Sequence, residues 1–99
     1  MGSNADAPKR LVFRVHAIQR MFERGITFED VHSIVMYGET IERYADDKPY
    51  PSRLILGWRA GRPLHAVVAD NDAVREVIVV TVYEPDPLRW DDDFRRRCR

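Results

Sequence analysis

Three basic side chains recur at a spacing of one helical turn near the start of the chain. His16 and Arg20 are four residues apart, and Arg24 follows after four more, so in a helix all three lie on one stripe. An imidazole exchanges a proton near neutral pH, and a guanidinium group holds phosphate oxygens through paired N–H donors. The stripe therefore indicates phosphate chemistry, and the alternative interpretation is a solvated helix face on which Glu23 pairs with an arginine.

Two further residues with acid–base chemistry fall in segments that favour β-strands. His65 is flanked by Leu64 and Ala66, so in a strand its side chain points to the opposite face from theirs. It is either a packed structural residue or a functional one that shares its face with Arg53 and Tyr83. Tyr83 ends a long β-branched run, where a phenol is held rigidly and can donate a proton or bind a phosphate.

The proline-broken loop 46–51 carries groups that suit contacts with RNA. Lys48 and Tyr50 lie within this loop, with Tyr44 before it and Arg53 after it. An aromatic ring can stack on a base while a cation contacts the backbone. The alternative interpretation of the same residues is ordinary turn chemistry.

Motifs for cofactors and metals are absent from the sequence. It has no glycine-rich phosphate loop and no nucleophile elbow, and its three histidines are scattered along the chain without chelating spacing. We therefore expect neither a metal site nor a cofactor.

Length and charge indicate one small domain with local rather than global charge. The chain has 99 residues, and 16 Lys and Arg balance 16 Asp and Glu, so any attraction to nucleic acid must come from a local patch. We interpret residues 1–10 as a disordered leader, residues 11–99 as a single domain and the terminal arginines as a solvated tail. No apolar run is long enough to span a membrane. The lone Cys98 and the absence of a signal sequence favour a cytoplasmic protein.

The hydrophobic periodicity changes from helical to extended along the chain. A helix is predicted over Val12–Arg24, ended by Gly25, and a second one between an N-cap at Thr27 and Gly38. Strands are predicted over residues 40–44, 52–59, 64–69 and 76–83, and a short helix over 88–97. The predicted core consists of apolar residues on the inward faces: Ile18, Phe22, Val31, Ile34, Val35, Leu54, Leu56, Val77 and Val79.

These elements predict an α+β fold. An N-terminal helical hairpin is expected to pack on a three- or four-stranded antiparallel sheet, with residues 76–83 as a central strand and a short C-terminal helix.

Four stretches carry a resemblance to a known family. They read HAIQRMFERG from His16, IERYADDKPYPSRLILGW from Ile41, GRPLHAVVA from Gly61 and VIVVTVYEPDPLRW from Val77. Together they resemble the bacterial domain-of-unknown-function 4258 family, whose element order is similar to that of RelE-like toxins. Relatives are often encoded beside a small zinc-finger antitoxin of the type that partners the MqsR toxin. The resemblance implies a RelE-like, RNA-cleaving toxin, with Tyr83 at the strand end where such toxins keep a catalytic or RNA-binding residue.

The resulting hypothesis is a metal-independent endoribonuclease in which an RNA 2′-hydroxyl attacks its neighbouring phosphate. His16 is the predicted base, with His65 as second choice, and Tyr83 is predicted to act as the acid or as a hydrogen-bond donor to the phosphate. Arg20 and Arg24 are expected to clamp the phosphate, supported by Arg53, and Lys48 and Tyr50 to bind RNA. These residues should then meet in one cleft.

The alternative hypothesis is a non-catalytic interaction module. In that case a strand edge or the basic stripe binds an antitoxin-like protein. The sequence leaves the oligomeric state open.

Overall fold

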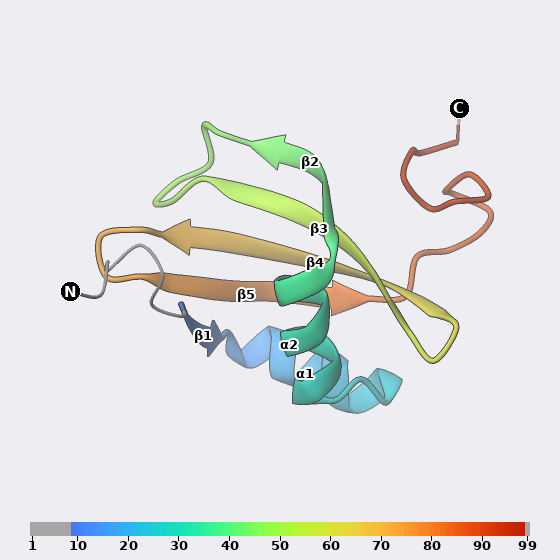
Figure 1. Cartoon of the computed structure of the whole chain (residues 1–99), viewed down its shortest axis with the longest axis horizontal. Coiled ribbons are helices and arrows are strands. Elements are labelled where there is room, and N and C mark those ends of the chain that lie inside the picture. The colour runs from blue at the N-terminus through green and yellow to red at the C-terminus, as the bar shows by residue number, and fades with distance from the viewer. Residues whose placement is uncertain (1–8, 99) are drawn as a thin grey trace.

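The computed structural model describes residues 9–98, which form a mixed sheet with two helices (Figure 1). The elements, in chain order, are β1 (Arg10–Phe13), α1 (Val15–Arg24), α2 (Phe28–Tyr37), β2 (Glu39–Tyr44), β3 (Ser52–Arg59), β4 (Arg62–Asn71) and β5 (Glu76–Tyr83). The strand order in the sheet is β1-β5-β4-β3-β2. Of the leader predicted for residues 1–10, residues 1–8 lie outside the described part, and Arg10 already belongs to β1.

The sheet differs from the predicted one at its N-terminal edge. β1 pairs in parallel with β5, with Leu11 opposite Val77 and Phe13 opposite Val79, while the other neighbouring strands are antiparallel. The predicted helical hairpin on three or four antiparallel strands is therefore wrong. β1 was missed because its apolar residues continue the pattern of the helix that follows, and its partner strand is distant in sequence. β5 is an interior strand, as expected, but β4 is the middle one.

α1 lies beside the second half of β5 and buries a different face from the predicted one. The backbone N–H of Arg14 bonds to the carbonyl of Val79, which places the helix start where the pairing of β1 ends. Ala17 is fully buried, whereas Phe22 is 89% exposed and Ile18 41% exposed. The predicted core positions Ile18 and Phe22 are thus wrong. A small residue at the contact lets the helix approach the strand closely.

α2 begins and ends where the sequence predicts. Thr27 forms a capping box with Asp30, each accepting a hydrogen bond from the backbone N–H of the other, and Gly38 ends the helix. Ile34 packs over β3 at Gly57, where a Cβ would lie 2.2 Å from Ile34 Cγ2. A glycine at this position therefore sets how closely the helix approaches the sheet.

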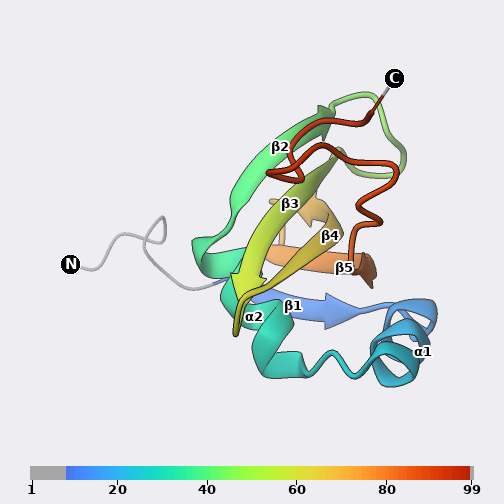
Figure 2. The ribbon, with the colours of Figure 1, turned by 90° about the vertical axis from the view of Figure 1, so that its right-hand side faces the viewer.

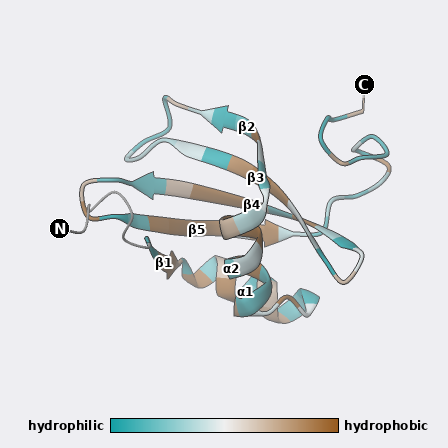
Figure 3. Cartoon of the chain, in the orientation of Figure 1, coloured by the Kyte–Doolittle hydropathy of each residue, from teal (hydrophilic) through white to brown (hydrophobic). Residues whose placement is uncertain are grey.

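The two faces of the sheet have different covers. Under the helices lies the main core, which comprises Ala17, Met21, Ile26, Val31, Ile34, Ile55, Leu64, Ala66, Val68, Val77, Val79 and Val82. The opposite face, called the C-terminal face below, carries Leu54, Leu56, His65, Val67 and Tyr83, which are cross-strand partners or alternate with core residues. The C-terminal segment 85–98 lies on the side of the strands away from α2 (Figure 2). Most of β5 is hydrophobic and most of the C-terminal segment is hydrophilic (Figure 3).

The C-terminal segment is not the short helix predicted over residues 88–97. It consists of turns closed by an isolated bridge between Trp90 and Arg97. Phe94 has a φ of 62°, which an α-helix does not allow. Contacts with the sheet replace helical bonds, since Arg95 pairs with Glu39 and Arg97 with Glu42. These arginines are therefore not the solvated tail predicted for them.

Within residues 9–98, no helix is long and apolar enough to cross a membrane.

Candidate functional site

His65 and Tyr83 form a hydrogen-bonded pair on the C-terminal face. They are register partners on β4 and β5, and His65 Nδ1 lies 3.2 Å from the Tyr83 hydroxyl oxygen. His65 Nε2 lies 2.9 Å from the carbonyl oxygen of Phe94. Because a carbonyl only accepts, Nε2 carries the proton of the neutral ring, and Nδ1 accepts from the Tyr83 hydroxyl.

The surroundings of this pair favour the neutral form of both groups. His65 is 0% exposed, and the ring of Trp90 stands edge-on to it with centroids 4.4 Å apart. Burial lowers the pKa of His65, and the positive charge of Arg97 acts in the same direction, although the Phe94 carbonyl and the charge of Glu42 oppose this change. Burial likewise raises the pKa of Tyr83. At neutral pH the pair is therefore a phenol that donates to a neutral imidazole.

A fixed ion pair stands next to His65. Arg97 Nη1 lies 2.9 and 2.7 Å from the two carboxylate oxygens of Glu42, and its guanidinium covers the ring of Trp90 at 4.9 Å. Burial would raise the pKa of Glu42, but hydrogen bonds from Tyr44 and Arg97 outweigh it and leave this pKa lowered. Glu42 is thus a carboxylate whose charge would stabilise a proton on His65.

Tyr83 lines a cavity of about 470 Å³, called the Tyr83 cavity below. Arg24, Arg89 and Arg97 also line it, together with the acidic residues Glu84 and Asp86 and with Trp90. Arg24 reaches it from the last turn of α1, where Nη1 donates to the Val82 carbonyl at 3.2 Å. Cations beside a hydrogen-bonding phenol can hold an anion such as a phosphate.

Comparison with known proteins identifies the family. The sequence pattern of DUF4258, described as a domain of unknown function, matches residues 13–84. The chain belongs to the DUF4258 family. No curated protein and no solved structure matches it. The matched range of this DUF4258 domain includes His65 and Tyr83, whereas Arg89, Trp90 and Arg97 follow it.

The remaining predicted site residues of the DUF4258 domain lie apart from Tyr83. His16, Lys48 and Tyr50 line a separate cavity of about 380 Å³, called the Tyr50 cavity below. Arg20 is exposed on α1, with Nη1 3.7 Å from a carboxylate oxygen of Glu23. The described residues therefore place the predicted site in separate cavities and not in one cleft.

Arg53 is separated from Tyr83 by the sheet itself. It alternates with Ser52 and Leu54 of the C-terminal face, so it points to the helix-covered side. There its Nε lies 2.9 Å from Asp70 Oδ2, and Nη1 lies 3.2 Å from the Thr40 hydroxyl. Its hydrogen bonds are used within the fold, which makes it a structural cation.

Sequence reasoning missed Glu42, Arg89, Trp90 and Arg97 as site residues. Glu42 and Tyr44 are two residues apart in the predicted strand and so share a face, and this spacing could have indicated a polar pair there. Arg97 gave no such signal, because a basic run at a chain end is commonly a solvated tail. Arg89 gave none either, since it stands alone beside the acidic run Asp91–Asp93.

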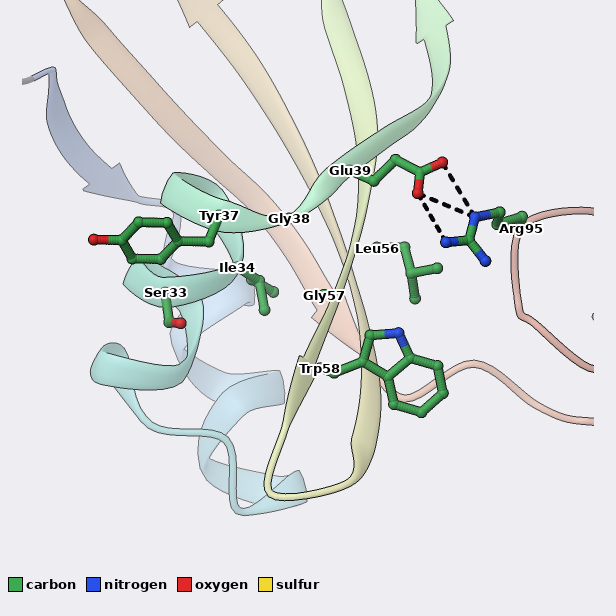
Figure 4. A pocket seen from close by; sticks show the side chains of 9 residues that line it. All are labelled: Ser33, Ile34, Tyr37, Gly38, Glu39, Leu56, Gly57, Trp58 and Arg95. Carbon is green, nitrogen blue, oxygen red and sulfur yellow. Dashed lines mark hydrogen bonds and ion pairs between the residues drawn. The ribbon is translucent and has the colours of Figure 1, made fainter.

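A further cavity lies at the corner between α2 and β3, where Arg95 of the C-terminal segment also lines it (Figure 4). Its volume is about 320 Å³, and the indole of Trp58 and the Arg95–Glu39 ion pair face it, whereas the ring of Tyr37 points away. Trp58 also packs edge-on against Phe94, with ring centroids 5.9 Å apart. This corner helps to hold Phe94, whose carbonyl accepts from His65.

In residues 9–98, no group of three or more His, Cys, Asp or Glu side chains could hold a metal ion. The expectation of a metal-independent reaction stays a prediction.

Proposed function

We propose that this DUF4258 domain is an endoribonuclease whose reaction takes place in the Tyr83 cavity. One observation carries the proposal: Tyr83, whose hydroxyl donates to a buried, neutral His65, lines a cavity together with arginines. A proton acceptor, a proton carrier and cations for phosphate oxygens are the parts that RNA cleavage by its own 2′-hydroxyl requires.

The proposed reaction moves one proton along the pair. As the 2′-oxygen attacks phosphorus, its proton passes to the Tyr83 oxygen, and the proton of Tyr83 passes to His65 Nδ1. The bond between phosphorus and the 5′-oxygen breaks, which leaves a 2′,3′-cyclic phosphate. The proton then returns through Tyr83 to the 5′-oxygen, so both side chains are restored.

The neighbouring charges fit the demands of each step. The carboxylate of Glu42 offsets the positive charge that His65 gains. Arg24 and Arg97 can stabilise the negative charge on the phosphate oxygens, since guanidinium–phosphate bonds are charge-assisted. His16 has no part in this scheme because it lies in the Tyr50 cavity.

Growth inhibition is a further part of the proposal. An endoribonuclease acting on cytoplasmic RNA would arrest the cell that makes it, and a cognate antitoxin, of the zinc-finger type, would relieve the arrest. Expression of the chain with and without the product of the adjacent gene tests this part.

The direct test incubates the purified protein with mixed RNA in excess chelator, with and without ribosomes, and analyses the ends of the fragments. We expect 2′,3′-cyclic phosphate ends. Tyr83→Phe, which removes only the hydroxyl, should slow cleavage by roughly 10²- to 10⁴-fold. His65→Gln should have a comparable effect, because the acceptor for that hydroxyl is lost.

Tyr37→Phe is the matched control, because Tyr37 is an exposed tyrosine on α2. It should cleave at the wild-type rate. Intact RNA in both conditions, or cleavage by Tyr83→Phe at the wild-type rate, would contradict the proposal.

A protein-interaction module is the second candidate, and an exposed apolar stripe on α1 favours it. Val15, Ile18 and Phe22 lie on one side of the helix and are all exposed, which is typical of surfaces that bind another protein. Co-purification with the adjacent gene product, lost in Phe22→Ala, without any toxicity of the chain alone, would favour this candidate.

A further inference from the structure

We propose that the Tyr50 cavity binds a nucleobase of the same single-stranded RNA whose phosphate lies in the Tyr83 cavity. This inference rests on the proposed function and adds a second subsite to it. The subsite would hold the RNA by one base at a distance from the cleaved bond.

The lining of the Tyr50 cavity suits a flat, partly apolar ligand attached to a negative backbone. Val67, Ala69 and Val80 supply an apolar floor from β4 and β5. The phenol ring of Tyr50 supplies an aromatic wall, and a base has a π-face that stacks on such a ring.

Basic residues from two elements line this cavity, and so does Asp47, whose carboxylate accepts a hydrogen bond from Ser52. Lys48 comes from the loop between β2 and β3, and Arg14 and His16 come from the start of α1. The positive charges of Lys48 and Arg14 can meet the sugar–phosphate backbone of a bound nucleotide. An uncharged apolar ligand would gain nothing from them, so charge complementarity favours a nucleotide.

The His16–Arg20–Arg24 stripe joins this subsite to the Tyr83 cavity. His16 lines one cavity and Arg24 the other, and Arg20 lies between them on α1. At about 1.5 Å per residue, the eight-residue separation spans about 12 Å along the helix. The stripe predicted from the sequence is thus a basic surface along which the RNA backbone can run between the two subsites. A cavity at each end of the stripe favours this interpretation over a merely solvated helix face.

The test measures binding of an RNA oligonucleotide that cannot be cleaved. Every 2′-hydroxyl of a mixed-sequence strand is methylated, and a series of such strands each lacks one base while keeping its phosphate. We expect wild-type affinity to fall roughly 5- to 150-fold when one particular base is missing, the loss expected for one base–aromatic stack.

Tyr50→Ala should weaken binding of the intact strand by a similar factor and should make removal of that base cost nothing more. Tyr37→Ala, the matched control on α2, should bind like the wild type. Lys48→Ala should lower the slope of log affinity against log salt by about 1, because one phosphate contact is lost.

The possible results separate this inference from the proposed function. Independent, additive effects of Tyr50→Ala and base removal, or no effect of Tyr50→Ala, would overturn the subsite while cleavage of ordinary RNA could still occur. A wild-type protein that binds no strand would overturn it as well. Coupled losses without any cleavage of ordinary RNA would support the subsite and reject the nuclease reaction.

Discussion

Replacing Gly57 with alanine tests whether the contact between α2 and β3 is as close as the structure shows. A Cβ at Gly57 would lie 2.2 Å from Ile34 Cγ2, 2.5 Å from Ile34 Cβ and 3.1 Å from Ile34 Cα. The first atom can rotate away with its side chain. The other two cannot, so α2 has to move as a unit.

The expected cost follows from that geometry. Inserting a methyl group into a packed core commonly costs about 1–3 kcal/mol. The clash with the Cβ and backbone of Ile34 places Gly57→Ala at the upper end, about 3 kcal/mol. This is a large part of the roughly 5–15 kcal/mol by which a small domain is stable.

Chemical denaturation measures the free energy of unfolding of each variant. Gly25→Ala is the matched control: Gly25 has a φ of 65°, and a Cβ added there would meet nothing within 4 Å, so only backbone strain is added. That strain should cost about 1–2 kcal/mol. Ile34→Ala removes the nearest atom, and in that background Gly57→Ala should cost less than it does alone.

A Gly57→Ala protein within about 0.5 kcal/mol of the wild type would refute this reasoning. That result would mean that α2 can move away from β3 freely.

Two further predictions concern His65 and the start of α2. Because burial lowers the pKa of His65 below its ordinary value of 6.5, the unfolded chain takes up a proton first as the pH falls. The stability that neutral His65 contributes is complete above about pH 6.5 and is lost towards the folded-state pKa, by at most about 1.4 kcal/mol per pH unit. The difference in unfolding free energy between wild type and His65→Gln should therefore narrow as the pH falls from 7 to 5; a constant difference would contradict the lowered pKa. Thr27→Ala removes the side-chain acceptor of the capping box and should cost about 1 kcal/mol in thermal or chemical unfolding, whereas Thr27→Ser should cost little. Equal stability of the two Thr27 variants would count against the cap.

Part of the candidate site could be predicted because it depends on local chemistry. His65 and Tyr83 are a titratable pair in strand-forming segments, and alternation correctly indicated that they can share a face. Arg24 followed from helical spacing. Their separation from His16 could not be predicted, because it depends on where α1 lies along β5. The roles of Glu42 and Arg97 depend on a C-terminal segment that folds back over the sheet.

The sequence by itself determined the elements whose signals lie within a few residues. Thr27 and Gly38 bound α2, Gly25 ends α1 with a left-handed φ, and strand-forming residues define β3 and β5 within their predicted limits. Each depends on the backbone preferences of adjacent residues.

Tertiary structure decided how these elements pair. The three apolar residues of β1 fit a helix or a strand equally well, and only pairing with distant β5 makes them a strand. That pairing fixes the start of α1, so Ala17 faces the core and Phe22 faces solvent. The C-terminal segment likewise takes its shape from ion pairs with β2 and from packing of Trp90 on His65, since its own residues form no continuous helix. Contacts between residues far apart in the chain set these features, and no local pattern contains them.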